Sequence, residues 1–191
     1  MLFDMRQSFT SNLVYTRIHE MAPSTDTCRS FMSQEPIVKL VQQQDYQFAI
    51  HFSDDLPPII ADEPPPLGAS KGPSPAQLLA AAVANCLSDS LLFALRKFKQ
   101  SPDPIETIAR CEIGRNTSNR LRVLAIHVQI TMGVPASSLE HLDRVLEQFE
   151  EFCTVSSSIN PHIPVHIAIT DSVGNDVFKN CLLYTSDAAD E

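Results

Sequence analysis

The sequence predicts an α+β fold whose elements follow the order ββ-α-ββ-α-β. Three observations predict it. Short β-rich runs come in pairs that suit hairpins, one long stretch repeats apolar residues at helical spacing, and residues 121–132 alternate strictly between two faces. Paired hairpins, in place of repeated strand-helix-strand units, favour α+β over α/β.

The first predicted hairpin joins strands at 37–41 and 46–52 through the polar residues 42–45. A long loop follows at 54–72, and it holds five prolines: Pro57, Pro58, Pro64, Pro65 and Pro66. Because proline lacks an N–H donor and has a fixed φ, this loop should be neither helix nor central strand. We expect an extended surface segment, long enough for a role as a lid or at an interface.

A helix is predicted from Pro75 to about Phe98. Ser74 suits the N-cap, Pro75 the first helical position, and Gln77 completes a capping box. The helix is apolar nearly all round up to Leu95, with one stripe formed by Leu79, Val83, Leu87, Leu91 and Leu95. Such a helix is buried on most sides. Since one chain of this length struggles to surround it, we expect a homodimer.

The second half predicts strands at 107–115 and 121–132, a helix and a last strand at 163–170. In the 121–132 strand, the apolar set faces the core: Leu124, Ile126, Val128, Ile130 and Met132. The helix should begin at Ser137, which forms a capping box with Glu140. Its apolar face comprises Leu142, Val145, Leu146 and Phe149, and Cys153 lies at or just past its end.

Composition and charge exclude several classes of partner. The net charge of −9 repels phosphate backbones, and the chain has no Trp, so nucleic acid is not an expected partner. No uninterrupted apolar run reaches membrane-spanning length, and the N-terminus lacks the pattern of a secretory signal. We therefore expect a cytoplasmic protein without a membrane partner, whose cysteines are reduced.

The two ends of the chain differ from the rest. Residues 1–31 show neither strand nor helix periodicity and are expected to be a non-native leader or a disordered arm. The last residues, CLLYTSDAADE at 181–191, resemble the translation of a transposase sequencing adapter and are interpreted as an artefact. The predicted domain is therefore 32–180.

The cysteines of this domain are Cys86 in the long helix, Cys111 on a strand and Cys153. Each of them, taken alone, is most simply a buried apolar residue. Neither a metal nor a cofactor is expected. His162 and His166 would share a strand face, but Pro164 interrupts it and the chain has no CxxC pair.

Two segments resemble the osmotically inducible protein C / organic hydroperoxide resistance (OsmC/Ohr) superfamily. These are Gly72–Cys86, with the sequence GPSPAQLLAAAVANC, and Phe152–Ser156, with the sequence FCTVS. The resemblance spans essentially all of 32–180 and implies the OsmC-like fold, an intertwined homodimer in which sheets wrap two central helices.

The resemblance also implies a thiol peroxidase for organic hydroperoxides. Cys86 would attack the hydroperoxide and become a sulfenic acid, Cys153 would condense with it to a disulfide, and a dithiol reductant would reset the pair.

The chain departs from the family pattern around the first cysteine. Ala76 and Gln77 stand where the family peroxidases carry Glu, and no Arg lies between Phe31 and Arg96. Asp89, three residues after Cys86, would raise the pKa of the thiol. The candidate activating or pocket residues are Glu63, Lys71, Gln77 and Asp89. The alternatives are an inactive OsmC-like dimer that binds an apolar small molecule and a redox sensor.

Overall fold

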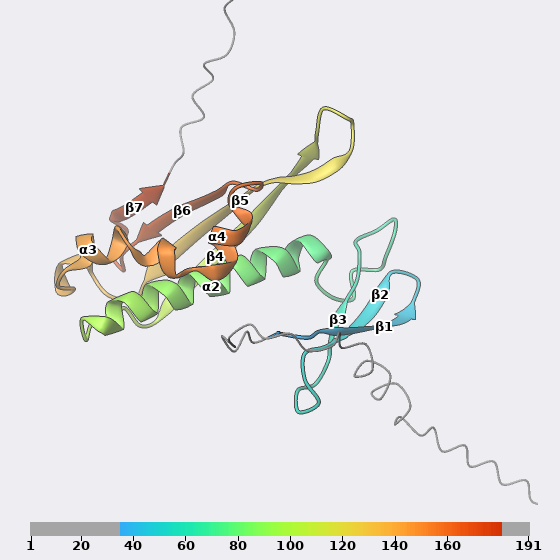
Figure 1. Ribbon diagram of the computed structural model, residues 1–191, viewed down its shortest axis with the longest axis horizontal. Helices are drawn as coiled ribbons and strands as arrows, with labels where there is room; N and C mark the ends of the chain where they lie inside the picture. The colour runs from blue at the N-terminus through green and yellow to red at the C-terminus, as the bar shows by residue number, and fades with distance from the viewer. Residues whose placement is uncertain (1–34, 181–191) are drawn as a thin grey trace, which may run out of the picture. The chain divides into compact units, whose positions relative to one another are not determined.

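The computed structural model describes residues 35–180. It is an α+β protein with one long helix, one antiparallel sheet and one mixed sheet (Figure 1). The expectations for residues 1–31 and 181–191 lie outside the described residues. The predicted fold class is confirmed.

The first sheet has three antiparallel strands, β1 (Lys39–Gln44), β2 (Gln47–His51) and β3 (Ile59–Ala61). The hairpin is confirmed, with a tighter turn than predicted, in which Asp45 adopts a positive φ of 44°. The segment at 54–72 contains neither a helix nor a central strand, as predicted, but it includes the edge strand β3, which was not predicted. β3 is a short edge strand between Pro58 and Pro64, so no proline interrupts its ladder.

The long helix α2 (Pro75–Lys97) begins as predicted. Ser74 Oγ accepts from the Gln77 amide at 3.4 Å, and Gln77 Oε1 accepts from the Ser74 amide at 2.8 Å. Val83, Leu87, Leu91 and Leu95 are fully buried, whereas Asn85, Asp89 and Phe93 are exposed. By length and composition alone α2 could cross a membrane, a test that the core helix of a folded domain also passes.

The second sheet places β4 (Ile105–Arg115), β5 (Leu121–Met132), β6 (Val165–Thr170) and β7 (Asp176–Asn180) in sequential order. β5 and β6 are parallel and the other neighbours antiparallel. The inward set of β5 is buried as predicted except for Leu124, which is 39% exposed and lies at the bulge in the pairing with β4, between Val123 and Ala125. The final hairpin to β7 was not predicted.

The crossover between β5 and β6 is broken into four short helices: η2 (Ala136–Ser138), α3 (Leu142–Leu146), η3 (Phe149–Phe152) and α4 (Thr154–Ile159). The single helix capped by Ser137 and Glu140 is therefore wrong. His141 adopts a positive φ of 61°, which ends any helix started at Ser137. The predicted apolar face is buried nonetheless, since burial against α2 and the sheet decides the path of the chain.

Asp171 fixes the corner between β6 and β7. Its side chain is buried, and it accepts hydrogen bonds from the amides of Ala136, Val173 and Asn175 and from the Asn175 side chain. These donors stabilise the carboxylate and lower its pKa from 3.8 to about 2. One side chain thus ties the start of the crossover to the last hairpin.

We predict that Asp171→Asn lowers the thermal midpoint of unfolding by several degrees at pH 7. Because the folded-state pKa is depressed, the carboxylate stabilises the fold above about pH 4, and this contribution is lost as the pH falls toward 2. The difference between wild type and variant should therefore shrink between these pH values. Asp55→Asn, at an exposed loop position, is the control, and an equal effect of both variants would contradict the assignment.

Candidate functional site

The structure brings the side chains of Cys86 and Cys153 together. Cys86 lies midway along α2 and is half-buried, Cys153 precedes α4 and is fully buried, and both are free thiols. The Cys153 side chain is a close neighbour of the Cys86 thiol and raises its pKa. Two cysteines 67 residues apart in sequence therefore share one site.

Cys153 is held by its position as the N-cap of α4. Its Sγ accepts from the Ser156 amide at 3.4 Å, and its own amide donates to the Glu150 carbonyl at 3.0 Å. The sulfur takes the place that a Ser or Thr oxygen usually fills at a helix start. The residues that follow Cys153 form this short helix, Thr154–Ile159.

The environment of Cys86 contains opposing effects. Burial raises the pKa of the Cys86 thiol, and the neighbouring Cys153 raises it further. The backbone amides of Val155 and Thr154, in the first turn of α4, act in the opposite direction because they can donate to a thiolate. The net pKa is raised, so the described residues around Cys86 favour the thiol over the thiolate at neutral pH.

None of the four candidate activating residues is among the groups that shift the pKa of Cys86 within the described part of the chain. Gln77 is engaged in the capping box at the start of α2. Asp89 is exposed and accepts from the Asn85 side chain at 3.0 Å. Glu63 and Lys71 both lie in the loop before α2.

That loop is organised by Asp62. The side chain is buried, and its Oδ2 accepts from the amides of Ala69 and Lys71, each at 3.0 Å. These backbone donors lower the pKa of the carboxyl group. Asp62 therefore holds the proline-rich loop in one conformation, and Lys71 contributes to this through its backbone.

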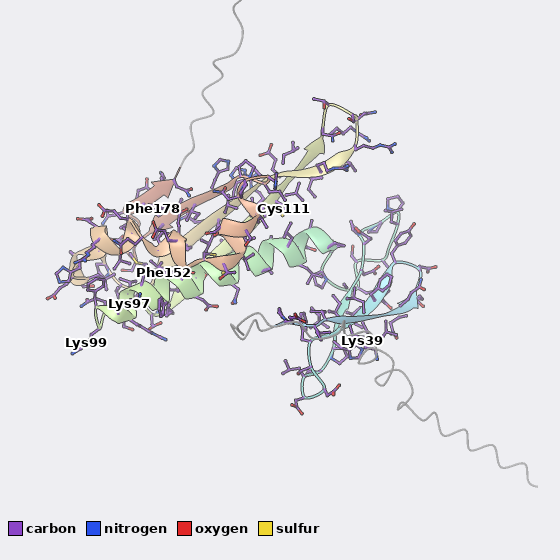
Figure 2. The ribbon with its side chains drawn as sticks, in the orientation of Figure 1. Lys39, Lys97, Lys99, Cys111, Phe152 and Phe178 are labelled. Carbon is purple, nitrogen blue, oxygen red and sulfur yellow. The ribbon has the colours of Figure 1, made fainter. Side chains whose placement is uncertain are left out.

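Sequence reasoning missed an aromatic pair near the cysteines. Phe93 and Phe152 meet edge to face with ring centroids 5.5 Å apart, and the rings are 52% and 40% exposed. Lys97 Nζ lies 4.5 Å from the Phe93 centroid and 4.2 Å from that of Phe152. Lys97 and Phe152 are labelled in Figure 2. Phe93 shares a helix face with Cys86, two turns away, and Phe152 precedes Cys153. These two sequence relationships, the spacing of seven residues from Cys86 to Phe93 and the adjacency of Phe152 and Cys153, could have indicated the pair.

The third cysteine of the domain has a packing role. Cys111 on β4 points toward α2, where its Sγ lies 3.3 Å from the Ala76 carbonyl oxygen, and burial raises the pKa of its thiol. Within residues 35–180, no group of three or more His, Cys, Asp or Glu side chains is placed to hold a metal ion.

The family model for OsmC-like proteins matches residues 68–168. The chain belongs to this family. The match includes both Cys86 and Cys153, as well as the whole of α2 and the crossover that carries α4.

Solved structures of OsmC-like proteins share the fold. A Psychrobacter arcticus protein ascribed to the osmotic stress and detoxification response is 22% identical, with a TM-score of 0.59, over 73% of this chain and 99% of its own. The organic hydroperoxide resistance protein of Elizabethkingia anophelis is 16% identical, with a TM-score of 0.56, over 75% and 100%. The organic hydroperoxide resistance protein OsmC of Legionella pneumophila is 16% identical, with a TM-score of 0.55, over 75% and 99%. Among curated proteins, none matches the sequence.

We predict that alkylation of Cys86 by iodoacetamide accelerates steadily up to and beyond pH 9. Burial raises the pKa of this thiol, so the thiolate fraction should grow about tenfold per pH unit across the neutral range. Residue-resolved mass spectrometry would follow Cys86 separately from the other cysteines. A rate that levels off below pH 7 would contradict a raised pKa for Cys86 and would indicate a nearby cation that stabilises its thiolate.

Proposed function

We propose that this OsmC-like protein is a cysteine-dependent thiol peroxidase that reduces organic hydroperoxides. The observation that carries the proposal is the pairing of Cys86 with Cys153 at the first turn of α4. Family membership and the names of the similar structures support the substrate class.

The proposed cycle has three balanced steps. The Cys86 thiolate attacks the terminal oxygen of the hydroperoxide, the O–O bond breaks, and the alkoxide takes a proton to leave as an alcohol. The Cys153 thiol then attacks the sulfur of the Cys86 sulfenic acid, an S–S bond forms, and water leaves. A dithiol reductant attacks the disulfide, returns both cysteines to thiols and is itself oxidised to a disulfide.

The backbone of α4 is the proposed stabiliser of the thiolate. The amides of Thr154 and Val155 lower the pKa of Cys86, so they favour its charged form at the moment of attack. Burial opposes them, and the thiolate is therefore a minor species at neutral pH. A thiolate of higher pKa is the stronger nucleophile, which partly offsets its low population.

An apolar rim beside the cysteines favours organic hydroperoxides over hydrogen peroxide. Phe93 and Phe152 present exposed ring surface on the same helix face as Cys86 and next to Cys153. An alkyl or aryl group gains from contact with such rings, whereas hydrogen peroxide has no apolar group to place there.

Titration of thiols in the full chain tests this proposal. We expect one equivalent of cumene hydroperoxide to consume two thiols, and peptide mapping to show a Cys86–Cys153 disulfide. Cys153→Ser should stop at the sulfenic acid, Cys86→Ser should consume no hydroperoxide above background, and Cys111→Ser is the matched control that should react as wild type.

Thiols that survive for hours would contradict the peroxidase and favour the second function, an OsmC-like dimer that binds an apolar small molecule. The raised pKa of Cys86 is the observation that favours this alternative. Disulfide formation without turnover by any dithiol would instead indicate a redox sensor.

A homodimer in the cytoplasm is part of the proposal. Apolar side chains are exposed on both sheets and on α2. Those in the strands of the first sheet are Leu40, Val41 and Ile59, and Tyr46 and Phe52 lie next to β2. A second copy that covers such surface gains hydrophobic free energy in proportion to the buried area.

We predict that sedimentation equilibrium gives twice the chain mass of 21.1 kDa at micromolar concentration. The reduced and the disulfide forms should both be dimers, since the cysteine pair lies within one chain. A monomer at all concentrations would contradict the homodimer.

A further inference from the structure

A row of basic side chains crosses the face of the second sheet that is turned away from α2. Arg110 on β4 pairs with His127 on β5, and His127 pairs with His166 on β6. Lys179 on β7 lies one step along, opposite Ala168. The strand register therefore gathers four basic groups on one face of a chain whose net charge is −9.

The four basic residues line part of a shallow depression. Its volume is about 350 Å³, and its lining includes all four basic residues together with Gln129 and Ala168. The imidazoles of His127 and His166 stack with centroids 4.9 Å apart, and Nδ1 of His166 is buried without a hydrogen-bond partner among the described residues.

The arrangement fits an anion better than a metal ion. The two imidazole planes are inclined by only 27°, so their in-plane lone pairs do not converge on one point. The described residues also place no third ligand there. Arg and protonated His offer N–H donors, which are the groups that bind phosphate and sulfate oxygens.

We propose that this depression binds a doubly charged oxyanion group, such as phosphate, and that protonation of the two histidines strengthens the binding. Arg110 and Lys179 are already charged, but Glu112 lies 3.2 Å from His127, and Asp176 pairs with Lys179 at 2.6 Å. At high pH these four charges offset one another. Protonation of His127 and His166 adds two positive charges, so the site becomes cationic as the pH falls.

The site differs from the cysteine pair in both position and chemistry. Its residues lie on the outward positions of the strands, whereas Cys111 on β4 points toward α2. Neither the hydroperoxide nor the dithiol of the proposed cycle carries the required doubly charged group. The inference therefore does not depend on the peroxidase.

NMR titration of the histidine ring protons in the full chain tests the proposal. Sulfate is the probe because its charge is constant over the relevant pH range, and chloride at equal ionic strength is the reference. We expect sulfate to raise the pKa of His127 and His166 by about one unit, which corresponds to about tenfold tighter binding to the protonated ring. His51, His141 and His162 report any general effect of the salt.

Arg110→Gln should abolish most of the sulfate-induced shift, whereas Arg122→Gln, the same change at an exposed position elsewhere on β5, should leave it intact. Equal shifts at all histidines, no shift at the pair, or equal effects of the two Arg variants would overturn the proposal. Phenyl phosphate separates the two sources of the anion. If phenyl phosphate binds more tightly than sulfate, the natural ligand is a larger molecule that carries the oxyanion group. If the two bind equally, the ligand is a free oxyanion.

Discussion

The packing of α2 against the second sheet is the constraint on which the rest of the structure depends. Val83, Leu87, Leu91 and Leu95 are fully buried in one cluster with the inward residues of β5 and β6. This contact sets the rotation of α2 and therefore the direction in which Cys86 points. A change in that rotation by one residue would turn Cys86 by about 100° and separate it from Cys153.

The crossover between β5 and β6 is the second half of this constraint. A single straight helix would bury its apolar face but would not deliver the first turn of α4 to the middle of α2. The chain instead uses short helices, so that Phe149 and Cys153 both reach the core while α4 begins beside Cys86. The local sequence preference for one capped helix yields to this packing.

The two candidate sites use opposite faces of one framework. The cysteine site lies where α2 and α4 meet, and its chemistry depends on burial and on backbone amides. The basic row lies on the outward positions of the second sheet, and its chemistry depends on the register of four strands. The same alternation of side chains along β4 places Cys111 inward and Arg110 outward.

The sequence by itself determined the class of fold, the start of α2 through the Ser74–Gln77 box, the strands of the main hairpin and the two cysteines that the structure brings together. Each rests on local signals, namely periodicity, capping residues and a motif. Tertiary structure alone decided three further features. These are β3 within a proline-rich loop, the broken crossover with its Cys153 cap, and the juxtaposition of Arg110, His127, His166 and Lys179. All three depend on contacts between segments that are distant in sequence. Local sequence patterns do not indicate the energies of such contacts.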